Sequence, residues 1–202
     1  MCAELTYFQN KLENPKRFFA DVELYLGDLN QKKVALLYTG IGKTNAAFAL
    51  TEALSVLAEN ELKVNQIINI GLAGGSSLEL GVIVQVKRTT YSDFDLSVFN
   101  DPVPSFDLNI NKELDLKQVV CYSADRFVTS PLDVKETSYV CDMELTSLAQ
   151  VADIKSIDLS AFKIVSDQVD AKTSQIKQYF ESKRPETMAK LNNILLSCLG
   201  DN

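Results

Sequence analysis

Short apolar runs that end near glycine or a carboxylate alternate with helical patterns along this chain, and this alternation constrains the fold more than any other feature. Two clear runs are VALLY (34–38) and QIINIGLAGG (66–75). A stripe of apolar residues at helical spacing follows Gly42, and a second helical pattern occupies 175–199. Strands that alternate with helices are typical of an α/β sheet covered by helices. We therefore expect one α/β domain over residues 1–202.

The same patterns predict the remaining elements. Turn residues between two apolar runs predict a hairpin, and Pro102 and Pro104 indicate an irregular connection. In chain order we expect a helix over 3–13, the hairpin over 22–38, a helix over 43–60, strands over 66–75 and 82–95, the irregular connection over 100–112, strands over 119–127, 139–145 and 161–167, and helices over 143–153 and 175–199.

Charge and composition exclude several classes of protein. The net charge is −7, and no cluster of Lys and Arg suggests a nucleic-acid surface. No apolar run is long enough to cross a membrane and the first residues lack a signal-peptide pattern, so we expect a cytoplasmic protein. The chain contains no histidine, which excludes Ser-His-Asp and Cys-His catalysis and imidazole metal sites. Acid–base chemistry would have to use carboxylates, lysine, tyrosine or a thiol, and we expect neither a metal nor a cofactor.

The sequence TGIGKT (39–44) is similar to part of a nucleotide-binding loop, but two patterns fail there. The P-loop needs glycine at position 37, which is Leu37, and the dinucleotide fingerprint needs a third glycine where Asn45 stands. A strand, a glycine turn and a helix remain. The first backbone N–H groups of such a helix point toward a polar group.

Polar residues gather at the carboxyl ends of the predicted strands, in GLAGG, YSDFD, SADRF, CDMEL and VSDQVD. Ligands of α/β sheets bind at such ends. Each carboxylate alone is more often only a helix N-cap. Together they predict a cleft lined by glycine backbone and carboxylates, with Phe127 beside it.

Six of these motifs, GIGKTNAA, INIGLAGG, YSDFD, SADRFV, DMEL and VSDQVD, occur in the order and spacing of the nucleoside phosphorylase and nucleosidase superfamily. The resemblance covers about 4–199 and is greatest to the 5'-methylthioadenosine/S-adenosylhomocysteine nucleosidases. It implies a three-layer α/β/α fold with a mixed central sheet. It also implies a purine nucleoside as the small-molecule partner and a homodimer, with the loop over 99–106 as a candidate lid facing the second subunit.

The resemblance implies the catalytic residues as well. Asp167 corresponds to the general acid that protonates adenine at N7, and Ser166 orients its carboxylate. Glu4 corresponds to the glutamate that activates the attacking water. The family's first strand precedes that glutamate and has no counterpart in this sequence, so we expect either that the true start of the chain lies upstream or that the sheet lacks this strand.

The implied binding residues lie at the strand ends. Glu144 corresponds to the residue that binds the ribose hydroxyls, Met143 packs under the sugar, and Phe127 stacks on the purine. The other implied binding positions are Val128, whose backbone reads the base edge, and Ala73, Gly74, Asp142, Lys163 and Ser166.

Three departures from the family pattern leave other functions open. Leu72 replaces a small hydroxyl residue, Asp142 replaces a glutamate, and Lys163 stands where nucleosidases have an arginine. The scarcity of arginine and the lack of histidine favour hydrolysis over phosphate-dependent cleavage. A phosphorylase of the same fold and a nucleoside-binding relative with little turnover remain the alternatives.

Overall fold

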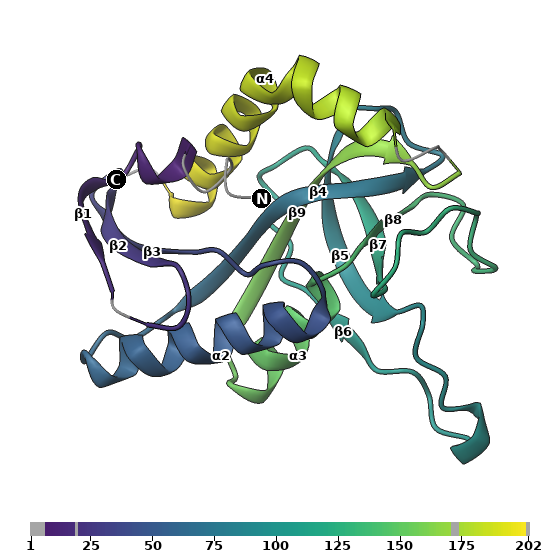
Figure 1. The fold of residues 1–202 in the computed structure, drawn as a ribbon, viewed down its shortest axis with the longest axis horizontal. Coiled ribbons are helices and arrows are strands. Elements are labelled where there is room, and N and C mark those ends of the chain that lie inside the picture. The colour runs from purple at the N-terminus through teal and green to yellow at the C-terminus, as the bar shows by residue number, and fades with distance from the viewer. Residues whose placement is uncertain (1–6, 19, 171–173, 201–202) are drawn as a thin grey trace.

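The structure is a computed structural model that describes residues 7–18, 20–170 and 174–200, arranged as two sheets with helices on their faces (Figure 1). The smaller sheet contains β1 (Glu13–Arg17), β2 (Leu24–Leu29) and β3 (Lys32–Leu37), paired antiparallel in that order. The predicted hairpin is confirmed by β2 and β3. Exposure alternates along most of β3, as expected for a strand with one covered face.

β1 overlaps the end of the helix predicted over 3–13. Residues 7–9 are helical, but the chain leaves the helix before β1 begins. Pro15 cannot continue a helix and also disfavours helical geometry at the residue before it, where Asn14 has a φ of 50°. The prediction is therefore wrong at its carboxyl end.

The larger sheet is mixed, as expected, and closes on itself. Its strands are β4 (Gln66–Ser76), β5 (Ile83–Tyr91), β6 (Ser105–Asp107), β7 (Lys117–Ser123), β8 (Tyr139–Asp142) and β9 (Asp158–Gln168). The order is β6-β5-β7-β8-β4-β9, and a further antiparallel pairing of β5 with β9 closes a ring. β4 runs parallel to β9, whereas β8 pairs antiparallel with the end of β4.

Helices cover both faces of the sheets. α2 (Lys43–Glu59) and α3 (Leu145–Ile154) lie side by side on one face, and α4 (Ser174–Leu199) crosses the opposite face (Figure 1). Ala46 and Leu50 of α2 pack against Leu148 of α3. This three-layer α/β/α arrangement confirms the expected fold. Within the described residues, no helix is long and apolar enough to cross a membrane.

The segment over 100–112 is only partly irregular. It contains β6, which pairs antiparallel with β5 after the two prolines have passed. Before it, the short 3-10 helix η1 (Ser97–Phe99) lies at the tip of an arm that projects from the body (Figure 1).

β3 and β4 are joined through α2 but do not pair with each other. Among the described residues, no strand pairs with the edge of β3 that faces away from β2. Likewise, Gln66–Ala73 of β4 pair only with β9, because β8 joins β4 at Gly74.

Candidate active site

A cavity of about 830 Å³ opens where β3, β4, β8 and β9 end. It brings together every predicted site residue that the structure describes. Glu4, the predicted base, lies outside the described residues. The predicted residues that line the cavity are Ala73, Gly74, Phe127, Val128, Asp142, Met143, Glu144, Lys163, Ser166 and Asp167.

Asp167 lies near the end of β9, half-buried against β4. The hydroxyl of Ser166 donates a hydrogen bond of 2.7 Å to Oδ1 of Asp167. Gly74 leaves space for the carboxylate, since a Cβ at this position would lie 3.1 Å from Oδ2 of Asp167. Burial raises the pKa of Asp167 above its ordinary value, and the hydrogen bond from Ser166 offsets this only in part. A half-buried carboxyl group with a raised pKa is suited to donate a proton.

Glu144 precedes α3 and reaches back to the glycine turn. Its Oε1 accepts a hydrogen bond of 2.9 Å from the backbone N–H of Gly42. Burial raises the pKa of Glu144, the charge of Asp142 adds to this, and the Gly42 hydrogen bond opposes it. The carboxylate therefore joins two segments that lie 102 positions apart in the sequence.

Asp142 and Lys163 form an ion pair beneath the cavity. Lys163 Nζ lies 2.8 Å from Oδ2 of Asp142, and the two side chains are 3% and 1% exposed. Burial alone would raise the pKa of Asp142, but the charge and hydrogen bond of Lys163 outweigh it and lower that pKa. Burial likewise opposes the charge on Lys163, and Asp142 raises its pKa overall. Both groups are held in their charged forms.

Hydrogen bonds from neighbouring strands fix Asp142. The hydroxyl of Ser123 on β7 donates to Oδ1 of Asp142 at 2.6 Å, and the backbone N–H of Leu145 donates to Oδ2 at 3.1 Å. The same Ser123 oxygen accepts a hydrogen bond from the N–H of Thr146 at 3.0 Å. Asp142 thus satisfies an N–H group in the first turn of α3, which positions Glu144 just before it.

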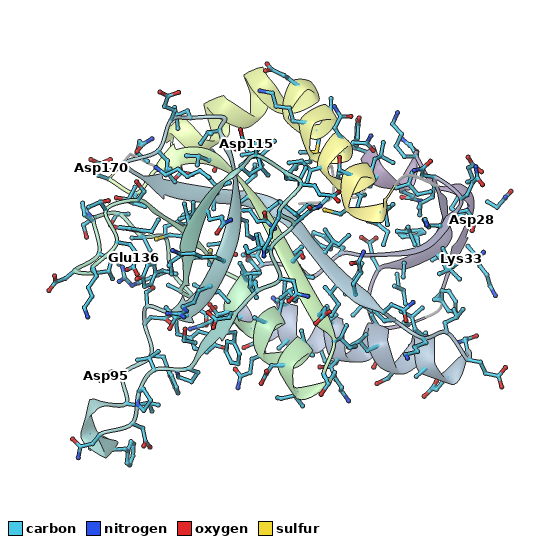
Figure 2. The ribbon with its side chains drawn as sticks, turned by 180° about the vertical axis from the view of Figure 1, so that it is seen from behind. Asp28, Lys33, Asp95, Asp115, Glu136 and Asp170 are labelled. Atoms are coloured by element: carbon cyan, nitrogen blue, oxygen red, sulfur yellow. The ribbon has the colours of Figure 1, made fainter. Side chains whose placement is uncertain are left out.

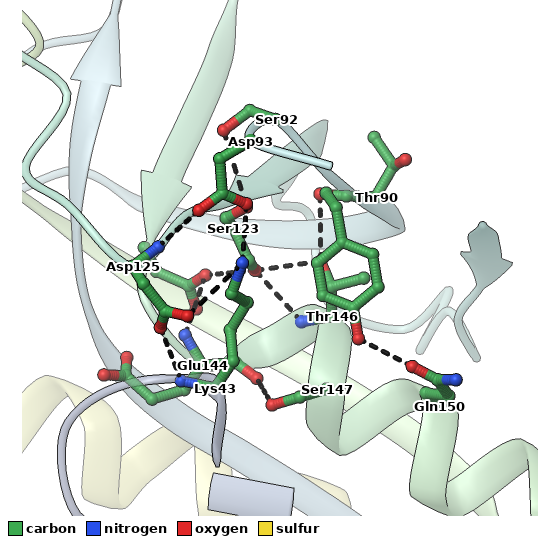
Figure 3. Close-up of polar contacts among 12 residues, drawn as sticks. Lys43, Thr90, Ser92, Asp93, Ser123, Asp125, Glu144, Thr146, Ser147 and Gln150 are labelled. Carbon is green, nitrogen blue, oxygen red and sulfur yellow. Dashed lines mark hydrogen bonds and ion pairs between the residues drawn. The ribbon is translucent and has the colours of Figure 1, made fainter. Parts of the chain in front are cut away.

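The first N–H groups of α2 do point at polar groups, as the TGIGKT pattern predicts, and those groups are carboxylates of this chain. Besides the bond from Gly42 to Glu144, the N–H of Lys43 donates to Oδ1 of Asp125 at 2.9 Å. Figure 3 shows the Lys43 side chain between Asp93 and Asp125, with Nζ 2.6 Å from Oδ1 of Asp93. Burial opposes charge at both ends of this closer pair, yet the pairing lowers the pKa of Asp93 and raises that of Lys43.

Lys43, Asp93 and Asp125 had no predicted individual role. Asp93 and Asp125 follow strands in YSDFD and SADRF, which is the signal that predicted carboxylates around the cleft. Their partner at the start of α2 could not be identified from the sequence, because the contacts join residues 50 and 82 positions apart.

The residues predicted to contact the base and sugar differ in exposure. Phe127 is 57% exposed and presents its ring at the cavity, free of the apolar core. Val128 is half-buried and packs against the cluster that contains Tyr122 and Tyr139. Met143 is half-buried beside Glu144. An exposed aromatic ring next to a half-buried apolar wall provides a surface for a flat heterocycle.

The family model of the phosphorylase superfamily matches residues 2–200, and the chain belongs to this superfamily. Solved structures with the same fold include three hydrolases. The 5'-methylthioadenosine/S-adenosylhomocysteine nucleosidase of Neisseria meningitidis, in complex with methylthio-immucillin-A, has a TM-score of 0.82 and 22% identity, over 98% of this chain and 96% of that one.

A second relative is the putative 5'-methylthioadenosine/S-adenosylhomocysteine nucleosidase of Borrelia burgdorferi B31, bound to adenine. Its TM-score is 0.74 and its identity 26%, over 95% of this chain and 97% of that one. The third is a mutant of the futalosine hydrolase of Helicobacter pylori, with a TM-score of 0.79 and 19% identity, over 96% and 93% of the two chains.

Proposed function

We propose that this protein hydrolyses the N-glycosidic bond of an adenine nucleoside, with 5'-methylthioadenosine or S-adenosylhomocysteine as the substrate. The observation that carries the proposal is the half-buried Asp167, whose pKa is raised by burial and whose carboxylate is held by Ser166 in the cavity. Adenine leaves poorly as an anion, and a positioned carboxylic acid removes this obstacle.

In the proposed reaction, protonated Asp167 donates its proton to N7 of adenine. The bond between C1' and N9 breaks, and its electron pair remains with the departing base. An oxocarbenium-like ribosyl centre forms and is attacked by water from the opposite face, as in sugar hydrolysis by two carboxylates. We propose that Glu4 accepts the proton of that water and that Glu144 holds the ribose hydroxyls.

The start of α2 favours water over phosphate as the attacking group. The resemblance to the superfamily implies that the glycine turn lies beside the sugar of the substrate, where a phosphorylase would hold phosphate. Here the N–H groups of Gly42 and Lys43 already donate to the carboxylates of Glu144 and Asp125. A phosphate at this position would have to displace one of them and would be repelled by the other. This is the specific observation against the phosphorylase alternative.

The choice of substrate rests on the relatives. Structures from Neisseria meningitidis and Borrelia burgdorferi carry a methylthio-substituted inhibitor and adenine, and both are called nucleosidases of thioether adenosines. The futalosine hydrolase has the same fold, so the group at the 5' position of the substrate has to be tested directly.

The test is adenine release from 5'-methylthioadenosine in buffer with and without phosphate. We expect release at the same rate in both buffers, because water is the proposed acceptor of the ribosyl group. Futalosine serves as the second substrate in the same assay. Release that requires phosphate would identify a phosphorylase, and binding of the nucleoside without release would identify a relative that has lost turnover.

We further propose that the chain acts as a single domain in the cytoplasm and assembles as a homodimer. The arm at η1 exposes Val98 by 85% and Phe99 by 71%, and Phe48 of α2 is 53% exposed. Large exposed apolar side chains of this kind favour an interface. The arm does not line the cavity of its own chain. If it acts as a lid, it would therefore cover the cavity of the second subunit.

Phe99→Asp is expected to weaken this dimer by about tenfold or more, because aromatic residues at interface centres contribute most of the binding free energy. Ile154→Asp is the matched control, since Ile154 is equally exposed, at 71%, but lies at the end of α3. Sedimentation equilibrium measures both. A wild-type protein that remains monomeric, or equal weakening by the two variants, would contradict the proposed interface.

A further inference from the structure

Three charged residues meet beside the cavity but do not line it: Lys43, Asp93 and Asp125. Lys43 begins α2, Asp93 follows β5 where the arm leaves the body, and Asp125 follows β7. Figure 2 shows Asp95, two residues beyond Asp93, on that arm. We name Lys43, Asp93 and Asp125 the charged cluster. Because the cluster lies outside the cavity wall, it can act on a bound nucleoside only through residues that it holds in place.

The members of the charged cluster are bonded to one another in a closed ring (Figure 3). Nζ of Lys43 lies 2.6 Å from Oδ1 of Asp93 and 3.4 Å from Oδ2 of Asp125. The N–H of Lys43 donates to Oδ1 of Asp125 at 2.9 Å, and the N–H of Asp125 donates to Oδ2 of Asp93 at 2.8 Å. Each residue contacts both of the others, so a displacement of one would break bonds to two.

The charged cluster holds the glycine turn on the side of the cavity where we propose that the ribose binds. Gly42 directly precedes Lys43, and its N–H donates to Oε1 of Glu144 at 2.9 Å. A Cβ at Gly42 would lie 3.4 Å from Oδ1 of Asp125, so the turn lies directly against that carboxylate. The N–H that holds Glu144 and the N–H that Asp125 accepts are consecutive, and Asp125 therefore fixes the direction of both.

The same aspartate begins the segment on the base side of the cavity. Asp125 is followed by Arg126 and Phe127, which both line the cavity. The N–H of Asp125 is bonded to Asp93 and its carboxylate to Lys43, so the backbone is fixed just before Phe127. One cluster therefore sets the spacing between the glycine turn and the aromatic ring that faces the cavity.

Lys43 is also linked to α3, the helix that Glu144 precedes. Its Nζ lies 5.2 Å from the centre of the Tyr91 ring, and a cation is attracted to the face of such a ring. The hydroxyl of Tyr91 donates to Oε1 of Gln150 on α3 at 2.7 Å. Both partners of the hydrogen bond between Gly42 and Glu144 are thus connected to Lys43.

The charged cluster is suited to positioning more than to stabilising the fold. The side chain of Asp125 is 51% exposed, and those of Lys43 and Asp93 are 19% and 21% exposed. Ion pairs that are open to solvent contribute little to stability. A displacement of a reacting group by about 1 Å, in contrast, can lower a rate by about 10²-fold. Loss of the cluster should therefore affect the reaction far more than the fold.

We propose that the three residues of the charged cluster are positioning residues for the proposed hydrolysis. They hold the Gly42 N–H that binds Glu144, and they fix the backbone that leads to Phe127. A nucleoside must reach both sides of the cavity at once, because its sugar and its base are joined by the bond that breaks. The cluster keeps the two sides at the spacing of one nucleoside. This inference rests on the proposed function.

Lys43→Met tests the cluster by leaving the carboxylates of Asp93 and Asp125 to repel each other without their cation. We expect kcat/KM for 5'-methylthioadenosine to fall by about tenfold to about 10²-fold, with little change in the melting temperature. Lys43→Arg keeps the cation and should recover part of the loss. The matched control is Arg88→Met, which removes the 2.7 Å ion pair with Asp107 outside the cavity and should leave kcat/KM unchanged.

Binding measurements separate positioning from a general loss of the site. Asp167→Asn is the background, so that 5'-methylthioadenosine binds without being cleaved. In this background Lys43→Met should weaken the nucleoside about tenfold in calorimetry, since a ribose contact to a charged group is lost. Adenine reaches only the base side, and its affinity should not change. Should Lys43→Met fail to fold, Asp93→Asn keeps the other two residues of the cluster and should show the same preferential loss.

Two results would overturn the inference: equal weakening of adenine and the nucleoside, or a kcat/KM for Lys43→Met at the wild-type level. Failure of the proposed function gives a different result, because the wild-type protein would then release no adenine. The two affinities would still decide whether the charged cluster positions a nucleoside. A protein that binds adenine but not 5'-methylthioadenosine would contradict both proposals.

Discussion

Asp167→Asn is expected to lower adenine release from 5'-methylthioadenosine by about 10²- to 10⁴-fold, the usual contribution of a general acid. Asparagine keeps the size of the side chain and can still accept the hydrogen bond from Ser166, but it has no proton to give to the purine. The folded state should tolerate the change, because the carboxylate is half-buried and its charged form is disfavoured there. Steady-state kinetics and a thermal melt of the same samples measure the two effects separately.

Ser166→Ala is the companion variant. It removes the 2.7 Å hydrogen bond to Asp167 but leaves the acid in place, so the expected loss is smaller than that for Asp167→Asn. Activity that survives in Asp167→Asn at the wild-type level would contradict the assignment of Asp167 as the acid.

The pH dependence gives an independent check on Asp167. The proton donor must be protonated, so the rate through this group falls as pH rises above its pKa. Because burial raises that pKa, the fall begins at a higher pH than for an ordinary aspartate. In Asp167→Asn this limb of the profile should disappear, whereas a purely structural role would leave its position unchanged.

The sequence was sufficient to predict those site residues that lie in a recognisable motif within a single segment. VSDQVD follows an apolar strand, so Asp167 could be placed at a strand end, and GLAGG likewise placed Gly74 at the end of β4. The parallel register of β4 and β9 then brings Gly74 opposite Asp167. Apart from β1 and β6, the order of strands and helices was predicted for the same reason, because periodicity is a local property.

Contacts between distant segments could not be predicted in this way. The partner of Gly42 is Glu144, and nothing within either motif specifies the other. The larger sheet closes because Ile83–Val86 of β5 pair with β9. The hydropathy pattern of either strand does not indicate this partner. β1 is short and contains Pro15, and β6 is short and directly follows Pro104. Their own residues do not favour a strand, and pairing with a neighbouring strand determines their conformation.

Lys163→Met is expected to lower the free energy of unfolding by roughly 3–5 kcal/mol, because it leaves the Asp142 carboxylate buried without its cation. Methionine preserves most of the volume of the lysine stem, so loss of packing contributes little. Urea denaturation measures the change. Should the protein remain too unstable to purify, binding of a stabilising nucleoside would shift the equilibrium toward the folded state.

The double variant Lys163→Met with Asp142→Asn separates the charge from the packing. The amide oxygen of asparagine, in the place of Oδ1, can still accept hydrogen bonds from Ser123 and from the Leu145 N–H, and neither side chain of the pair is then charged. The double variant should therefore be more stable than either single variant, with a coupling of about 1–3 kcal/mol. Additive losses would mean that the ion pair contributes no more than its two separate side chains.

The effect of Lys163→Met should also depend on pH. The folded pKa of Asp142 lies below its unfolded value, so the pair contributes stability above about pH 4 and loses it as pH falls through the folded pKa. The wild-type protein and the variant should consequently approach each other in stability under acid conditions and differ most near neutrality. A difference that stays constant across that range would indicate that packing, rather than the charge of Asp142, underlies the loss.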